Sequence, residues 1–338
     1  MIGKGVRFIL ALKAIPRVGD KRIIEYLREQ DRSSLLHQEV VKTAITAIKN
    51  LEAADWTRCL AAADEEIAKA NDRGINIISY LDAYYPMNLL ALNNAPTILY
   101  VKGNYKLLNT DKSVAIIGTR EPTEYGKRID NLFSKTLSLD GFTVVSGLAI
   151  GCDTYAHEGT LTGRGKTVAI LAHGLDQPVY PKRNRALAER ILEQDGALMS
   201  TYPIGTKLRP QYLAARDEWQ SGMSDGVLVI ETDVQGGTRI AMRHSVHQHR
   251  PLAVIDYRQR GKMSQRALDI PKFRGNYDAI QHQNAIPVFT REELIAFENK
   301  MIADHNTRAA AGQEDKSQST QMDLFWIATK LGKHKNQD

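Results

Sequence analysis

Short runs of continuous apolar residues alternate with helix-length segments through the middle of the chain, and this alternation restricts the fold more than any other feature. The clearest runs are Ser113–Ile117, Thr167–Leu171 and Val227–Ile230. A strand that is buried on both faces consists of continuous apolar residues, whereas a half-exposed strand alternates apolar and polar ones. Parallel strands also need long crossover connections, which are usually helices. The pattern therefore predicts an α/β domain with a doubly wound, mostly parallel sheet.

Weaker patterns extend this sheet on both sides. Further strands are expected at Ile75–Ile78, Ile98–Val101, Phe142–Val145, Pro251–Ile255 and Ile286–Phe289. After the run that ends at Ile117, apolar residues recur at the spacing of one helix face, at Ile129, Leu132, Phe133 and Leu137. Gly141 is typical of the residue that ends such a helix. Because open α/β sheets bind ligands outside the carboxyl ends of their strands, functional residues are expected there.

The composition divides the chain into three parts. Residues 1–74 predict a small helical domain, and Ile15–Gly19 resembles the turn of a helix-hairpin-helix motif, although Arg17 stands at the position of the usual first glycine. A helical hairpin that only packs on the next domain is the alternative. Residues 75–298 contain the expected sheet. Residues 299–338 are interpreted as a linker and a flexible C-terminal tail, because Ala309–Thr320 has neither aromatic nor branched apolar residues.

Composition also excludes several classes of protein. Two cysteines, Cys59 and Cys152, form no CxxC pair, so neither a disulfide framework nor a thiolate metal site is expected. The apolar runs are too short to span a bilayer, and the N-terminus lacks the cleavage site of a signal peptide. We therefore expect a cytoplasmic protein that binds no membrane. The formal net charge of +6 favours an anionic partner.

Two glycine-containing turns follow expected strands and suit an anion. Gly118-Thr119-Arg120 offers a close backbone approach, a hydroxyl group, the amides of the next helix and a guanidinium that can clamp a phosphate. Ser146-Gly147 begins the second turn, in which Asp153 is expected to cap the following helix. His157 is expected to be a packed structural residue. No serine or cysteine nucleophile is spaced to pair with that histidine, so no catalytic residue is expected.

Several segments, taken in order, resemble the family of DNA-processing protein A (DprA/Smf). They are VAIIGTREPTEYG, VVSGLAIGCDTYAHEGTL, GKTVAILAHGLDQPVYPKRNRALAERI, GALMSTYP and MSDGVLVIETDVQGGT. The resemblance covers residues 75–298 and implies a Rossmann-like sheet. It also implies a non-catalytic protein that binds single-stranded DNA, associates with itself as a homodimer or larger homo-oligomer, and delivers DNA to a RecA-type recombinase. No cofactor and no metal ion are implied.

The two turns and the resemblance together indicate one binding site. The residues expected to bind DNA or phosphate are Gly118, Thr119, Arg120, Ser146, Gly147, Lys182, Arg183, Arg216, Gly236, Gly237 and Thr238. The chain departs from the family pattern where Asp217 and Glu218 replace an asparagine and an arginine. This change removes positive charge next to Arg216, which is expected to weaken phosphate binding and its salt dependence. The chain is therefore interpreted as a divergent member.

Two functions of other classes are also considered. The first is a regulatory or antitoxin-like defence protein, whose pocket senses a nucleotide-derived ligand or whose surface restrains a partner protein. The second is a phosphoribohydrolase-like enzyme, because Gly236-Gly237-Thr238 resembles part of the PGGxGTxxE motif of those enzymes. The sequence disfavours the enzyme, since Ala241 stands at the position of the catalytic glutamate.

A short motif in the tail resembles the peptide with which bacterial proteins bind the sliding clamp. It consists of Gln321, Met322, Asp323, Leu324 and Phe325. In such a peptide the leucine and phenylalanine fill an apolar groove, while the glutamine fixes the register by hydrogen bonds. The alternative is a helix that docks back on the core through the same apolar residues.

Overall fold

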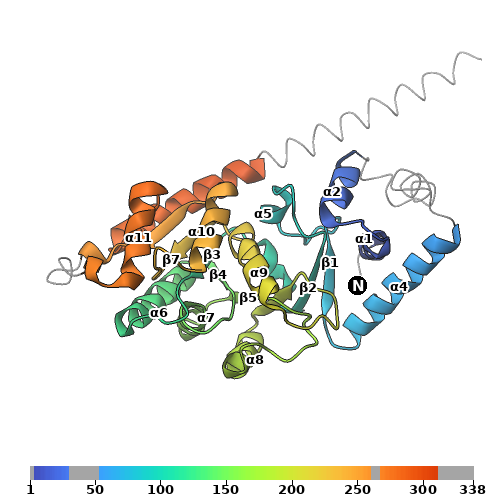
Figure 1. Ribbon diagram of the computed structural model, residues 1–338, viewed down its shortest axis with the longest axis horizontal. Helices are drawn as coiled ribbons and strands as arrows, with labels where there is room; N and C mark the ends of the chain where they lie inside the picture. The colour runs from blue at the N-terminus through green and yellow to red at the C-terminus, as the bar shows by residue number, and fades with distance from the viewer. Residues whose placement is uncertain (1–3, 30–52, 260–266, 311–338) are drawn as a thin grey trace, which may run out of the picture.

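The computed structural model describes residues 4–29, 53–259 and 267–310, which contain a nine-stranded sheet. Its strand order is β1-β2-β6-β5-β4-β3-β7-β8-β9 (Figure 1). All neighbours from β6 to β9 are parallel, whereas β2 is antiparallel to both β1 and β6. The strands are β1 (Asn76–Ser79), β2 (Ile98–Gly103), β3 (Ser113–Ile117), β4 (Thr143–Ser146), β5 (Thr167–Leu171), β6 (Ala197–Ser200), β7 (Gly226–Val229), β8 (Leu252–Ile255) and β9 (Ile286–Val288).

The structure confirms the predicted mostly parallel sheet and adds one strand to it. β3 and β5 have the predicted bounds, and the other predicted strands differ by one or two residues at either end. β6 was not predicted. Its residues, Ala-Leu-Met-Ser, include no β-branched or aromatic side chain, and alanine, leucine and methionine favour helices. This strand is nevertheless central, because it joins the parallel part of the sheet to β2.

Helices cover both faces of the sheet. Val114 and Ile116 of β3 pack in a core that includes α6 and the helix formed by residues 291–310, whereas Ala115 and Ile117 pack on the opposite face with α10. The sheet is therefore doubly wound, as the continuous apolar strands predicted. The helices of this region are α6 (Glu124–Leu139), α7 (Cys152–Thr162), α8 (Arg185–Glu193), α9 (Pro210–Gly222), α10 (Thr238–His247) and α11 (Pro271–His282).

Helix α6 follows the predicted pattern except at one residue. Ile129, Phe133 and Leu137 are buried and pack on the sheet, but Leu132 is 56% exposed. Thr123 begins the helix, since its hydroxyl accepts a hydrogen bond from the Gly126 amide. Gly141 follows the helix with φ of 88°, a left-handed conformation that glycine adopts without strain. The prediction that Leu132 lies on the apolar face is wrong, because the buried face is narrower than the sequence pattern.

The N-terminal helices pack on the antiparallel edge of the sheet. They are α1 (Lys4–Ala14), α2 (Asp20–Glu29) and α4 (Ala53–Asn71), and a short helix α5 (Met87–Leu90) follows β1. Ile15 and Val18 of the turn between α1 and α2 are buried, while Arg17 is exposed with φ of 68°. The Asp20 carboxylate accepts a hydrogen bond from the Thr97 amide at 3.0 Å. The buried side chains of this turn therefore pack against the rest of the chain, while Arg17 remains exposed.

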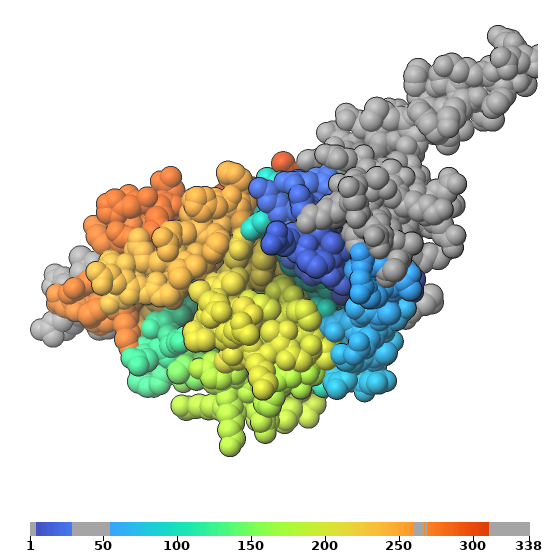
Figure 2. All heavy atoms as spheres, turned by 45° about the vertical axis from the view of Figure 1, so that its right-hand side comes forward, coloured from blue at the N-terminus to red at the C-terminus, as the bar shows by residue number. Residues whose placement is uncertain are grey.

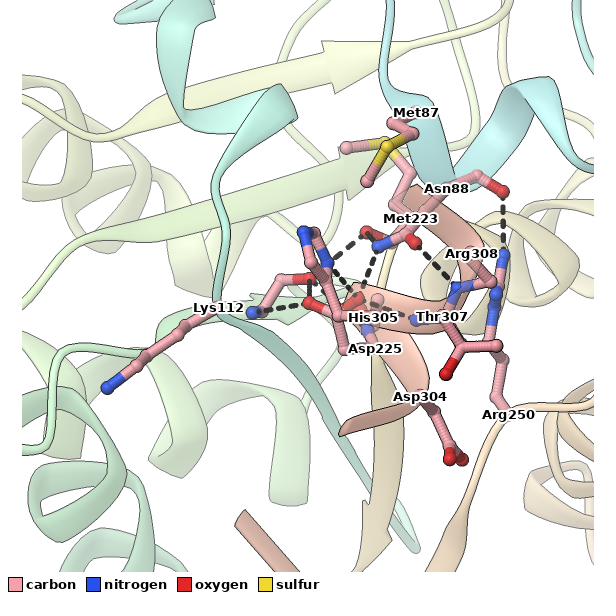
Figure 3. A network of polar contacts seen from close by, with 12 residues as sticks. Met87, Asn88, Lys112, Met223, Asp225, Arg250, Asp304, His305, Thr307 and Arg308 are labelled. Atoms are coloured by element: carbon pink, nitrogen blue, oxygen red, sulfur yellow. Dashed lines mark hydrogen bonds and ion pairs between the residues drawn. The ribbon is translucent and has the colours of Figure 1, made fainter. Parts of the chain in front are cut away.

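The helix of residues 291–310 corrects the predicted start of the tail at residue 299. Met301 and His305 are buried, and His305 Nδ1 lies 2.8 Å from Oδ1 of Asp225, the residue before β7 (Figure 3). Arg308 donates to the same carboxylate at 2.7 Å, and Asn88 of α5 donates to it at 2.9 Å. Residues 299–310 are therefore packed helix, and the polar composition there reflects one exposed helix face.

The remaining predictions for the tail lie outside the described residues. These include the rest of the expected linker and the clamp-like motif from Gln321 to Phe325. Among the helices of residues 4–29, 53–259 and 267–310, none is both long enough and apolar enough to cross a membrane.

Candidate functional site

A pocket opens at the carboxyl ends of β3, β4 and β5, where the fold class predicts a ligand site. Its polar lining comes from Arg120 after β3, the Gly147 backbone after β4, His173 after β5 and Arg216 on α9. Figure 2 shows α9 in yellow at the surface, between the yellow-green α8 region and the blue N-terminal helices. The apolar lining comes from Ile150, Leu171, Tyr180, Leu208 and Leu213. We call this hollow the Arg120–Arg216 pocket.

The first predicted turn contributes its arginine to the pocket, but the amides of the next helix are already engaged. Arg120 is exposed at the pocket, and the Thr119 hydroxyl accepts a hydrogen bond from the Glu121 amide. The buried Glu231 carboxylate accepts hydrogen bonds from the amide and the hydroxyl of Thr123, at the N-terminus of α6. An internal carboxylate therefore already accepts hydrogen bonds from part of the helix end that was expected to bind a phosphate.

Gly118 is required by close packing rather than by ligand access. A Cβ atom at this position would lie 2.4 Å from Cys152 Sγ and 3.1 Å from the Glu231 carbonyl oxygen. Its role is therefore to let α7 approach the end of β3, which places Arg120 beside the second turn.

The second turn is built around a buried arginine. Arg216 is 4% exposed, and a Cβ atom at Gly147 would lie 1.3 Å from its Nη1 atom. Its Nη1 atom lies 3.6 Å from Asp153 Oδ2, and its Nε atom lies 3.1 Å from Asp217 Oδ1 without the alignment of a hydrogen bond. Nη1 also donates to the Ile170 carbonyl at 3.3 Å. Only glycine at position 147 leaves room for this guanidinium.

Burial is the main cause of the shifted pKa values of the groups around Arg216. It raises the pKa of Asp153, and it raises the pKa of Asp217 to about 6, although the Arg216 charge opposes both shifts. Burial, helped by the same charge, lowers the pKa of His157 to about 3. His157 is therefore neutral at physiological pH, and it is fully buried with Nδ1 2.7 Å from Thr167 Oγ1. The expectation of a packed structural histidine is confirmed.

Two predicted roles in the second turn are wrong. The Ser146 hydroxyl is fully buried and donates to the Ile116 carbonyl at 2.7 Å, so it holds β4 to β3 instead of facing a ligand. Asp153 does not cap α7, because the residue before the helix is Gly151. The Asp153 carboxylate instead accepts from the Ala149 amide at 3.2 Å, inside the turn, and faces Arg216. The conformation of Gly151, with φ of 88°, moves the helix start by two residues.

The basic segment after Tyr180–Pro181 lies on the rim of the pocket. Lys182 and Arg183 are exposed, while Asn184 is buried and donates to the Leu148 carbonyl at 2.9 Å and to Thr154 Oγ1 at 2.9 Å. This amide ties the basic segment to the second turn. Tyr180, whose side chain lines the pocket, is 48% exposed. Two exposed cations therefore follow directly after two residues that line the pocket, Tyr180 and Pro181.

The turn of Gly236, Gly237 and Thr238 does not line the pocket. It follows β7, which lies on the other side of β3 from β4 and β5. Both glycines are exposed, and a Cβ atom at Gly237 would meet nothing within 4 Å. The structure thus brings Arg120, Gly147 and Arg216 together in the pocket, places Lys182 and Arg183 directly after its lining residue Pro181, and leaves this turn apart.

Sequence reasoning missed most of the apolar lining. Leu208 and Leu213 belong to a loop and helix that were not predicted, so nothing placed them opposite Arg120. Asn184 and Tyr180 stand within a segment quoted for the family resemblance, where an asparagine and an aromatic residue flank the two cations. That spacing was the available indication of an exposed aromatic ring beside two cations.

The fold and the pocket define a Rossmann-like protein with a basic rim at the carboxyl edge of its sheet. The chain matches the family of DNA recombination-mediator protein A over residues 76–298, and it therefore belongs to this family. It is 32% identical over 189 residues to DNA processing protein DprA of Bacillus subtilis, covering 56% of this chain and 63% of that protein. It is 36% identical over 172 residues to Protein Smf of Escherichia coli, covering 51% of this chain and 46% of that one.

Two solved structures support the fold. The DprA structure from Streptococcus pneumoniae superposes with a TM-score of 0.67 at 24% identity, covering 87% of this chain and 98% of that chain. DNA processing protein A of Helicobacter pylori, whose structure concerns its single-stranded DNA binding mode, superposes with a TM-score of 0.56 at 27% identity. That match covers 68% of this chain and 96% of the Helicobacter chain.

Proposed function

We propose that this protein binds single-stranded DNA in and beside the Arg120–Arg216 pocket and acts as a non-catalytic mediator of DNA processing and recombination. The observation that carries the proposal is an apolar pocket lined by Arg120 and an exposed tyrosine, with the exposed Lys182 and Arg183 directly after its lining residue Pro181. Cations bind the phosphate backbone, and an aromatic ring stacks on an unpaired base of any sequence. Family membership and the single-stranded DNA studied with the Helicobacter relative support the same ligand.

The rim and the floor of the pocket are expected to bind different parts of the DNA. Arg120, Lys182 and Arg183 are exposed cations, so they are the groups available to phosphates. Arg216 is buried between two carboxylates, and its charge is already neutralised. We expect the floor to accept the apolar face of a base beside Leu171 and Leu213. Binding should therefore depend on salt through the rim cations.

Binding of a fluorescent oligothymidylate, followed by anisotropy at two salt concentrations, tests this function. Arg120→Ala should weaken binding by roughly 1–3 kcal/mol, the usual loss for a charged hydrogen bond, and should flatten the salt dependence. Lys135→Ala removes an exposed cation from α6 and is the matched control, which should bind like the unaltered chain. Failure of the unaltered chain to bind at low salt would contradict the proposed function.

We also propose partners other than DNA, on the basis of the family resemblance and of a short motif in the C-terminal tail. A RecA-type recombinase and a second copy of this chain follow from the family resemblance, and a sliding clamp follows from Gln321–Phe325. The clamp proposal predicts that the full chain co-elutes with purified clamp, whereas a Leu324→Ala, Phe325→Ala variant does not. The same variant should still bind oligothymidylate, since both substitutions lie outside the pocket residues.

A further inference from the structure

One buried guanidinium in the pocket faces two carboxylates. The side chain of Arg216 is 5% exposed, and those of its partners Asp153 and Asp217 are 9% and 20% exposed. Asp217 directly follows Arg216 on the same helix, α9, while Asp153 comes from α7. With both carboxylates ionised, this triad carries one net negative charge beside a pocket whose rim is proposed to bind phosphates.

Few other groups face Asp217. On α9 they are Arg216 and Gln220, whose side-chain amide donates to Asp217 Oδ1 at 3.0 Å. Across the pocket they are Asp153 and the more distant guanidinium of Arg120. His157 of α7 interacts with Arg216 but is neutral, so it supplies no charge. Arg120 is the only ionised group among these that an entering phosphate can both reach and attract, because it is exposed at the rim.

A phosphate that binds Arg120 at the rim of the pocket adds a negative charge near a triad that is already negative. Like charges in a poorly solvated site disfavour the ionised form of a carboxylic acid. Protonation of one carboxylate leaves Arg216 paired with the other and makes the triad neutral. Asp217 is the carboxylate better placed to take this proton, since it is the more exposed of the two and makes no hydrogen bond to a backbone amide that would hold its charge.

We propose that anion binding in the Arg120–Arg216 pocket is coupled to the uptake of one proton by Asp217, which makes this residue the determinant of pH dependence for the pocket. The proposal rests on the proposed function for its ligand, a DNA phosphate. Burial raises the pKa of the Asp217 carboxyl to about 6 in the free pocket. This value still lies below pH 7, so Asp217 is largely ionised at that pH. Affinity should therefore increase as pH falls toward 6 and decrease as pH rises above it.

Oligothymidylate binding by the full chain, measured at pH 7.5 and pH 5.5 and constant ionic strength, tests the coupling. The unaltered chain should gain about tenfold more affinity between these pH values than Asp217→Asn, which keeps the shape but has no proton to take up. Asp217→Asn should also bind more tightly at pH 7.5. Glu218→Gln is the matched control, because it removes the same charge one residue further along α9, where Glu218 faces Asn94 and His244.

Calorimetry of the unaltered chain gives a second measurement that needs no variant. Titrations at pH 7 in two buffers of different ionisation enthalpy should show uptake of about one proton per oligothymidylate bound. Asp217→Asn should show correspondingly less, and Glu218→Gln should match the unaltered chain. Absence of binding at both pH values contradicts this proposal together with the proposed function. Binding with equal pH dependence in the unaltered chain and Asp217→Asn overturns the proton coupling alone.

Discussion

At the scale of single residues, the contact between Gly147 and Arg216 is the tightest structural requirement of the pocket. A methyl group at position 147 would overlap the guanidinium, because the Cβ atom would lie 1.3 Å from Nη1 and 2.7 Å from Asp153 Oδ2. Gly147→Ala must therefore displace Arg216 and leave buried charges without partners. We expect a loss of about 3–5 kcal/mol in the free energy of unfolding, measured by urea denaturation.

Gly237→Ala is the matched control for this prediction. Gly237 is exposed, has nothing within 4 Å of its Cβ position and has φ of −57°, which alanine adopts without strain. Its substitution should change the free energy of unfolding by about 0.5 kcal/mol or less. Equal stability of Gly147→Ala and Gly237→Ala would show that the guanidinium can move at little cost.

The same contact explains why the site was only partly predictable from the sequence. Arg120, Lys182 and Arg183 come from turns directly after strands or within a recognised segment, so their placement followed from the order of the motifs. The environment of Arg216 depends on the orientation of α9, which no hydrophobic pattern predicted. Asp217 was read as an acidic residue beside a DNA path, whereas it is an ion-pair partner of a buried arginine.

At the scale of elements, the helix of residues 291–310 is fixed to the rest of the fold by polar contacts with the buried carboxylate of Asp225. The side chain of Asp225 is 1% exposed and receives hydrogen bonds from Arg308, Asn88 and Ser113, with His305 Nδ1 2.8 Å away (Figure 3). These partners hold the pKa of Asp225 below its usual range, even though burial opposes the shift. The resulting stability is present above the unfolded pKa of about 4 and is lost as pH falls through the lower folded value.

We expect His305→Ala to loosen this helix before the rest of the molecule. The substitution removes one of the partners of a buried carboxylate, which should lower the free energy of unfolding by about 1–3 kcal/mol. Hydrogen exchange of the amides in residues 299–310 should accelerate more than that of β3. Asn306→Ala, an exposed position on the same helix, should leave both measurements unchanged. Uniform acceleration in helix and strand would show that the helix does not open separately.

The strands show why some elements were predictable and others were not. β3 and β5 are buried on both faces and rich in valine and isoleucine, so composition and burial agree and their bounds were predicted. β6 is also fully buried, but Ala197, Leu198 and Met199 favour a helix by themselves. Its pairing with β5 and β2 overrides that preference, and such pairing depends on residues far away in the sequence.

At the scale of the whole molecule, the N-terminal helices and the sheet share one apolar core. Ile9 of α1 and Ile24 of α2 belong to the same buried cluster as Tyr100 of β2 and Ile170 of β5. Glu66 of α4 also accepts a hydrogen bond from the Ile204 amide at 2.8 Å, in the loop that leads to the pocket. The helices α1, α2 and α4 of the segment predicted as residues 1–74 therefore complete the core of the sheet.

This shared core predicts that Ile24→Ala destabilises the whole chain and not only its N-terminal helices. Ile24 is 1% exposed, and removing three carbon atoms from such a site usually costs about 2–5 kcal/mol. Differential scanning calorimetry should show a single transition in the unaltered chain and in the variant, with equal calorimetric and van't Hoff enthalpies and a lower Tm in the variant. Ile295→Ala, at a position that is 40% exposed, is the control and should shift Tm little. Two resolved transitions, of which only one responds to Ile24→Ala, would mean that the N-terminal helices unfold independently of the sheet.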